Sequence, residues 1–177
     1  LQLFTIGLYQ LHPDGTLRLS ETGAPIDTYG QAEVSGFSQV FTGWNWHQAL
    51  TTPSNTQSPG TNHFGPMTLV IQSGVPRYHE FAAKQILDGV IIPARTPSIA
   101  NAMQNLADAH NQLFNHNNTA PFICKQLIQR LVTSNPSPGY VYRVSQVFAD
   151  NGQGIRGDLK AVVKAILLDY EAGAPYD

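Results

Sequence analysis

Charged residues are scarce in this chain. Asp, Glu, Lys and Arg make up 12% of its 177 residues, against the ~25% usual in globular proteins. The formal net charge is -2 and the Lys and Arg residues are scattered, so the sequence lacks the basic stripe of a nucleic-acid-binding protein. We therefore expect no nucleic-acid partner. A polar but weakly charged exterior favours an extracytoplasmic or assembly-embedded protein over a cytosolic one.

Cysteine is nearly absent as well. The single cysteine, Cys124, excludes an internal disulfide. It falls on the same helix face as Leu127, Ile128 and Leu131, which predicts a small buried hydrophobic residue. A nucleophilic cysteine would need a nearby base, and no histidine is close to it in sequence.

Several motifs and patterns are missing. No apolar run approaches the ~20 residues of a membrane span, so none is expected. The histidines are widely spaced and form no HxH or HExxH pattern, so we predict no metal site. The phosphate-binding and serine-hydrolase motifs GxxxxGK[ST] and GxSxG are absent too. We therefore expect no cofactor.

Helical periodicity is what the chain does have, mostly between Asn117 and Glu171. Apolar residues recur there at i, i+3 and i+4 in three segments, which predicts three amphipathic helices. The first follows Asn118-Thr119, and the second begins at Ser137-Pro138, a helix cap followed by proline. The expected buried positions of the third are Ile155, Leu159, Val162, Val163, Ile166, Leu167 and Tyr170.

Turn signals dominate the first half. His12–Gly15 predicts one hairpin, and Asp88-Gly89, between Ala83–Leu87 and Val90–Ile92, predicts a second. Met67–Ile71 has the composition of a short strand.

Two further helices are expected from capping patterns. The spacing of Thr28 and Gln31 fits a capping box for a helix that ends before Gly43. Thr96-Pro97 predicts the start of a helix that runs to about Asn115. The stretch from Trp44 to Gly65 lacks such signals, and irregular stretches of this length are usually functional or disordered loops.

Together these patterns predict a mainly α protein: a compact helical bundle with two small β hairpins and a long irregular loop. We expect a single domain over residues 1–177, with the hairpins, one helix and the loop in 1–93 and the helical bundle in 94–177. The chain opens on Leu1 without an initiator Met, as if cut from a helix. This predicts a fragment of a larger protein, whose remainder would be its first partner.

The run PFICKQLIQRLVTSNPSPGYVYRVSQVF, followed by NGQGIRGDLKAVVKAILLD, resembles the C-terminal part of the bacterial domain-of-unknown-function 1800 family. LQLFTIGLYQL, the segment ending in FTGW, and YHEFAAKQILDG fit the same family in the same order. The resemblance implies a large exported bacterial protein, often encoded beside a sulfatase-like family. Its expected location is therefore extracytoplasmic, either periplasmic or secreted. The resemblance implies no established activity.

The first candidate for a catalytic site is His79, Glu80 and Lys84. The resemblance implies a His and a Lys at this spacing, ahead of the second hairpin. His79 would act as acid or base, Glu80 would orient it, and Lys84 would hold an anionic group. The alternative is a hydrogen-bonded cluster that pins the loop to the hairpin.

A ligand-binding stretch is the second candidate: Thr42, Trp44, Trp46 and His47. Aromatic rings on an irregular segment stack on sugars and other flat apolar faces. The alternative is that Trp44 packs into the core while Thr42 bonds the local backbone.

Three functions remain open on this basis. The first is a binding or assembly module for a surface polymer or partner protein, favoured by low charge and the absence of a strong catalytic motif. The second is an enzyme acting on extracellular polysaccharide through His79, Glu80 and Lys84. The third is a structural half of a larger fold.

Overall fold

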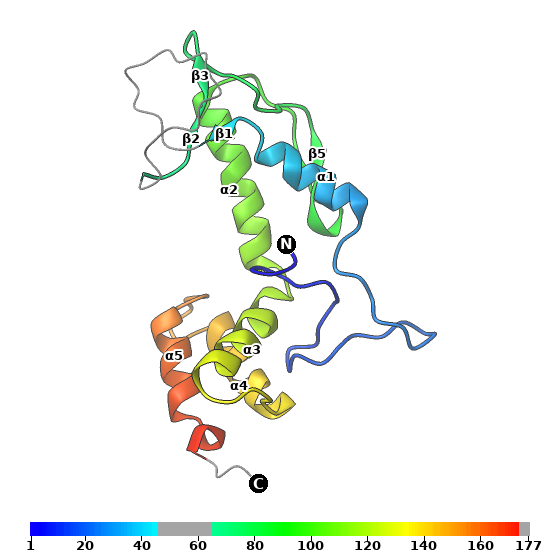
Figure 1. Ribbon diagram of the computed structural model, residues 1–177, viewed down its shortest axis with the longest axis vertical. Helices are drawn as coiled ribbons and strands as arrows, with labels where there is room; N and C mark the ends of the chain where they lie inside the picture. Colours follow the sequence, from blue (N-terminus) through cyan, green and yellow to red (C-terminus); the bar gives the residue numbers. More distant parts are fainter. Residues whose placement is uncertain (46–64, 174–177) are drawn as a thin grey trace. The chain divides into compact units, whose positions relative to one another are not determined.

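The computed structural model describes residues 1–45 and 65–173 (Figure 1). The chain divides into two compact units. We call residues 1–29 with 113–177 the helical unit, and residues 30–112 the mixed unit. The described residues are rich in helix, and their strands form three small antiparallel sheets of two strands each. The predicted single-domain organisation stays a prediction.

Helices α3 (Thr119–Leu131), α4 (Pro138–Ala149) and α5 (Leu159–Leu168) contact one another pairwise in the helical unit, and a short 3-10 helix, η2 (Tyr170–Gly173), follows them. The predicted start of α4 is confirmed, because Ser137 Oγ accepts a hydrogen bond of 3.1 Å from the Tyr140 N–H and Pro138 follows it. Asp158 caps α5 in the same way, through a bond of 3.1 Å from the Ala161 N–H.

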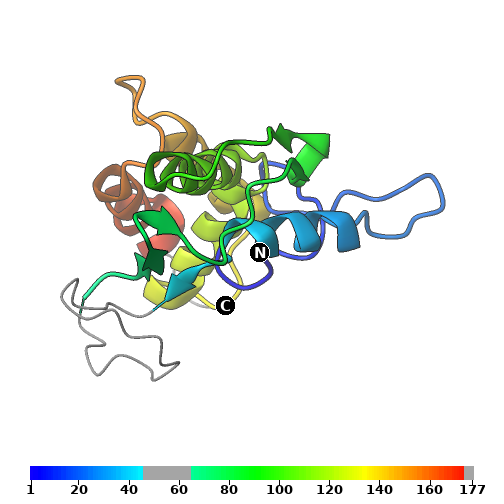
Figure 2. The same ribbon diagram turned by 90° about the horizontal axis from the view of Figure 1, so that it is seen from above.

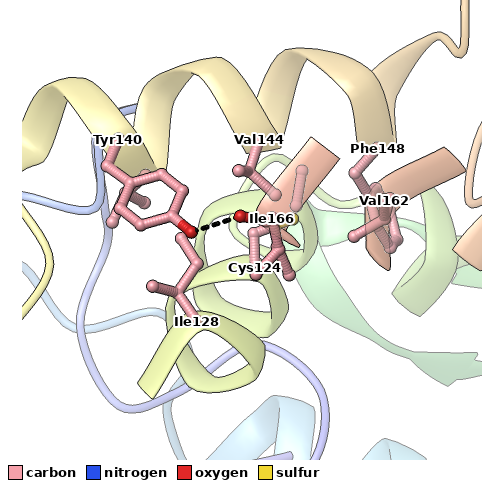
Figure 3. Packing of buried hydrophobic residues seen from close by; sticks show 9 residues of the cluster. Cys124, Ile128, Tyr140, Val144, Phe148, Val162 and Ile166 are labelled. Atoms are coloured by element: carbon pink, nitrogen blue, oxygen red, sulfur yellow. Dashed lines mark hydrogen bonds between the residues drawn. The ribbon is translucent and has the colours of Figure 1, made fainter. Parts of the chain in front are cut away.

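The core of this unit lies where the three helices meet, as Figure 3 shows. Tyr140 is fully buried, and its hydroxyl donates to the Ile166 carbonyl at 2.6 Å. Cys124 is buried as predicted, and burial raises the pKa of its thiol to about 12. The buried side chains of this core are Ala120, Cys124, Ile128, Tyr140, Val141, Val144, Phe148, Val162 and Ile166.

The predicted buried face of α5 was too wide. Ile155 precedes the helix and is exposed, and Leu159 and Leu167 are exposed as well. Only Val162 and Ile166 of this helix are buried in the described structure. The helix is short, and it contacts the core through one residue from each of two successive turns.

Residues 1–29 contain no helix or regular strand and are drawn as a continuous loop (Figure 1 and Figure 2). Antiparallel bridges join Leu11 to Leu17 and Leu19 to Pro25, so the first predicted hairpin is present, although its ladder is too short to count as strands. Asn118 holds this loop: its Nδ2 donates to the carbonyls of Ile6 at 2.9 Å and Tyr9 at 2.7 Å.

The mixed unit combines α1 (Gln31–Val40), the first part of α2 (Ile99–Asn115) and the small sheets. The sheets pair β1 (Trp44–Asn45) with β2 (Thr68–Leu69), β3 (Ile71–Gln72) with β4 (Val75–Pro76), and β5 (Lys84–Gln85) with β6 (Ile91–Ile92). Between β5 and β6 lies the short 3-10 turn η1 (Leu87–Gly89). Asp88 and Gly89 both have positive φ there, which confirms the predicted Asp-Gly turn.

Two predicted helix starts were wrong. Gly30, not Thr28, precedes α1, and Glu33 Oε2 accepts from the Gly30 N–H at 2.8 Å. The Thr28 hydroxyl accepts instead from Asn118 Nδ2. Helix α2 is capped by Ser98, whose Oγ accepts from the Asn101 N–H at 3.1 Å, so the start lies later than Thr96-Pro97 indicated.

Two strand expectations also need correction. The run Met67–Ile71 does not form one strand: β2 and β3 divide it, and they pair with different partners. Trp44 begins a strand and not an irregular stretch, because it pairs with Leu69 in the β1–β2 sheet. Each of these strands has two residues, which is too short for an alternating apolar pattern to be recognised in the sequence.

Candidate functional site

His79 is the centre of a polar cluster inside the mixed unit. The side chain is only 8% exposed. Its Nδ1 lies 2.9 Å from the Thr42 carbonyl oxygen, and its Nε2 lies 3.0 Å from Asn105 Nδ2. Both ring nitrogens are therefore engaged. We call the residues that form this arrangement the His79 cluster: Thr42, His79, Glu80, Lys84, Arg95, Asn105 and Asp108.

Asn105 sets the proton arrangement of the ring. Arg95 Nη1 donates to Asn105 Oδ1, so the oxygen of this amide faces the guanidinium and its NH2 group faces His79. An amide NH2 only donates, so His79 Nε2 accepts and the ring proton sits on Nδ1, from which it is donated to the Thr42 carbonyl. This geometry matches a neutral imidazole in one tautomer.

Arg95 extends the cluster to an ion pair. Its Nη2 lies 2.6 Å from Asp108 Oδ2, and Gln104 Nε2 donates to the other oxygen of this carboxylate at 2.8 Å. The Arg95 backbone N–H donates to the Phe81 carbonyl at 2.9 Å. Both ends of Arg95 are therefore fixed, which holds the Asn105 amide in its orientation.

Thr42 and Glu80 connect the cluster to the end of α1. The Thr42 hydroxyl donates to the Gln39 carbonyl at 2.6 Å and accepts from the Glu80 N–H at 2.8 Å. The Glu80 carboxylate accepts from the Ala82 N–H at 2.7 Å. In this geometry the carboxylate orients its own loop, whereas Asn105 and Thr42 orient His79.

Lys84 is buried beside the cluster, with 3% of its surface exposed. Its Nζ donates to the carbonyl oxygens of Glu80 at 3.0 Å and Ala82 at 2.7 Å. Burial lowers the pKa of this amine; the nearby Glu80 carboxylate acts in the opposite direction and Arg95 in the same direction. Lys84 thus bonds the loop that carries Glu80.

Tyr78 is exposed, unlike the buried His79 that follows it. It is 66% exposed, and its backbone has a φ of 68°, which is a strained conformation for a bulky side chain. The Arg77 guanidinium carbon lies 4.7 Å from the centroid of the Tyr78 ring, in a cation–π arrangement. We call this pair, the half-buried Arg77 and the exposed Tyr78, the ledge; it directly precedes the buried His79 in the chain.

Gly43 explains how this strained segment is held. A Cβ added to Gly43 would lie 2.9 Å from both the Arg77 carbonyl oxygen and the His79 nitrogen. Only a glycine fits such an approach without displacing the opposite backbone. Residues 77–79 are therefore clamped against the end of α1 by contact at Gly43 and by the hydrogen bonds of His79.

The predicted ligand-binding stretch is only partly visible. Thr42 bonds the local backbone, and Trp44 is half-buried in β1. The Trp44 indole Nε1 is buried without a hydrogen-bond partner in the described part of the chain. Trp46 and His47 lie outside the described residues.

The structure brings together residues that the sequence kept in separate candidate groups. Thr42 contacts both His79 and Glu80, and Lys84 bonds the Glu80 carbonyl. Asn105 was missed, together with Arg95 and Asp108. One signal was available: Asn105 lies between Ala102 and Ala109 on the buried face of α2, where a polar residue needs a partner.

Residues 1–45 and 65–173 contain no group of three or more His, Cys, Asp or Glu side chains placed to hold a metal ion. None of the helices described there combines the length and apolarity needed to cross a membrane.

Comparisons with known proteins give the family. No curated protein and no solved structure matches the chain. Residues 1–176 match the family described as "Protein of unknown function (DUF1800)". The match covers nearly the whole sequence, and the chain therefore belongs to this family.

Proposed function

We propose that this chain is a binding module of an exported, extracytoplasmic bacterial protein, and that it binds a surface polymer. The observation that carries the proposal is the contrast between neighbouring residues of one segment. His79 is buried and bonded through both ring nitrogens, whereas Tyr78 beside it is exposed and held in a strained conformation. Strain of this kind persists where the surroundings enforce it, and it is frequent at ligand sites.

The His79 cluster supports this function as a clamp. A general base needs a nitrogen within reach of the proton that it removes, and both nitrogens of His79 are occupied by Thr42 and Asn105. Lys84 donates to two carbonyls of its own loop. These groups rigidify residues 77–84, and a rigid loop lowers the entropy cost of binding.

Binding to a polymer panel tests the proposal. Purified protein would be co-sedimented with bacterial surface polysaccharides, both neutral and acidic, and the bound fraction measured. Tyr78→Ala is expected to lose binding, while Tyr142→Ala, which removes an exposed tyrosine of α4, is expected to retain it. Equal binding by the two variants would contradict a polymer site at Tyr78, and a lack of all polymer binding would favour a partner protein as the ligand.

An enzyme acting on extracellular polysaccharide is the second candidate, with His79, Glu80 and Lys84 as its catalytic residues. The observation that favours it is the lowered pKa of Lys84, caused by burial, because shifted pKa values gather at catalytic sites. The test is release of reducing ends from the same polymers. Loss of this activity in His79→Ala, with an unchanged melting temperature, would support catalysis over the clamp.

A further inference from the structure

The ledge formed by Arg77 and Tyr78 has the chemistry of a specific subsite. One face of the Tyr78 ring is covered by the Arg77 guanidinium, at 4.7 Å, yet the residue as a whole is 66% exposed. The ring therefore offers surface to a ligand while its other face carries a positive charge. Sugar rings stack on such surfaces through their apolar C–H faces, as other flat apolar groups do.

Arg77 adds selectivity for charge. The side chain is half-buried, and no carboxylate within residues 1–45 and 65–173 forms an ion pair with it. The nearby Glu80 carboxylate is directed to the Ala82 N–H. A guanidinium presents a planar fork of N–H donors that matches a carboxylate, and partial burial weakens the screening of such a pair by salt.

The ledge is also pre-organised. Tyr78 holds its left-handed conformation because His79 is bonded on both sides and Gly43 meets the backbone of residues 77–79 closely. A residue with two side-chain torsions on a fixed backbone loses little entropy when it binds. The contacts of the His79 cluster thus offset the backbone strain at Tyr78 before any ligand binds.

We propose that Arg77 and Tyr78 form a subsite for an acidic polysaccharide built from uronic acid residues. One sugar ring stacks on Tyr78, and a carboxylate of the polymer binds the Arg77 guanidinium. This inference rests on the proposed polymer-binding function and deepens it by naming the class of polymer. It requires no metal and no covalent step.

The test compares polygalacturonate with its methyl-esterified form, which keeps the sugar backbone and removes the charge. Binding of the full chain would be measured by isothermal titration calorimetry, with dextran as a neutral polymer of another backbone. Arg77→Gln removes the charge. Tyr78→Asn removes the ring and suits a left-handed backbone, which asparagine tolerates. The matched controls are Arg130→Gln, on an exposed position of α3, and Tyr142→Asn on α4.

The expected result is preferential binding of polygalacturonate over the methyl ester and dextran. Arg77→Gln and Tyr78→Asn should each weaken it by about tenfold, the size of one good charged or stacking contact, and the controls should not. Raising the salt concentration should weaken binding by the wild type more than by Arg77→Gln.

Three results would overturn the inference, and they separate it from the proposed function. Equal binding of the acidic and esterified polymers, or binding of any polymer that is insensitive to both ledge variants, would remove the uronate subsite and leave polymer binding standing. Absence of binding to every polymer tested would remove both.

Discussion

At the scale of single residues, one amide decides what His79 can do. Asn105 lies fully buried on α2, with its oxygen toward Arg95 and its nitrogen toward His79. Along this series of hydrogen bonds each side chain is the bonding partner of the next, so the cluster is a cooperative unit. Removing one member leaves buried partners unpaired, which costs more than the lost bond itself.

Asn105→Ala is expected to destabilise the protein by about 1–3 kcal/mol, because His79 Nε2 and the Arg95 guanidinium both lose a buried partner. Urea unfolding measures the change. Met103→Ala, two residues earlier on an exposed position of α2, should change stability by no more than about 0.5 kcal/mol. Similar unfolding midpoints for the two variants would show that the cluster does not contribute to folding.

Tyr78 is expected to behave in the opposite way. Its φ of 68° costs a bulky residue roughly 1–2 kcal/mol, and asparagine tolerates this region better. Tyr78→Asn should therefore keep or raise the melting temperature, measured by differential scanning calorimetry, even though it removes the stacking with Arg77. A clear fall would mean that the ring contributes to stability, and the argument from strain to binding would fail.

At the scale of elements, the contact between α1 and β5 depends on Gly36. A Cβ at this position would lie 1.6 Å from the Gln85 carbonyl oxygen, so the helix and the strand meet backbone to backbone. No side-chain rotation relieves such an overlap. The helix also places Phe37 and Val40 in the buried interior of the mixed unit.

Gly36→Ala tests this contact, because the expected change in stability is opposite to the usual effect of replacing a helical glycine by alanine. At an ordinary helical position the change from glycine to alanine stabilises by about 1 kcal/mol, whereas here it forces the two elements apart and should destabilise by about 1–3 kcal/mol, as overpacking does. Ser35→Ala, at the exposed neighbouring position, is the control. Chemical denaturation that shows Gly36→Ala to be more stable than wild type would rule out the close approach.

Elements with local signals could be predicted from sequence, and the others could not. Ser137-Pro138 and Asp88-Gly89 specify a helix start and a turn through their own backbone preferences, and both were confirmed. The start of α1 was misplaced because Thr28 bonds Asn118, 90 residues away. No local sequence pattern identifies Asn118 as the partner of Thr28.

The candidate site shows the same division. His79 and Lys84 were singled out from sequence together with Thr42, and they do lie in one cluster. Their partners Asn105 and Arg95 were missed. The place of Asn105 on the apolar face of α2 signals a buried polar residue, but neither Asn105 nor Arg95, which precedes α2, carries a local pattern that identifies His79 as its neighbour. The strain at Tyr78 is likewise a backbone property that the sequence does not display.

At the scale of the whole molecule, few charges are present and several of them are concentrated in ion pairs within one unit or the other. In the helical unit Arg143 Nη2 lies 2.8 Å from both Asp169 Oδ1 and Glu171 Oε1, and the guanidinium also stacks on the Tyr170 ring at 4.5 Å. Hydrogen bonding to Arg143 lowers the pKa of Asp169 and the pKa of Glu171. Arg143 therefore joins Asp169 and Glu171 to α4.

This arrangement predicts the direction of the acid sensitivity. A carboxyl whose pKa is lowered on folding contributes stability that is fully present above its unfolded value, about 4 for Asp and Glu, and that is lost as pH falls through the folded value. The free energy of unfolding should thus decrease steadily from about pH 5 downward.

Arg143→Gln should flatten this dependence, because it removes the group that lowers both pKa values, while Lys164→Gln on an exposed position of α5 should not. Urea unfolding at a series of pH values between 3 and 7 measures the slope, and parallel curves for wild type and Arg143→Gln would show that this ion pair does not control the acid stability of the molecule.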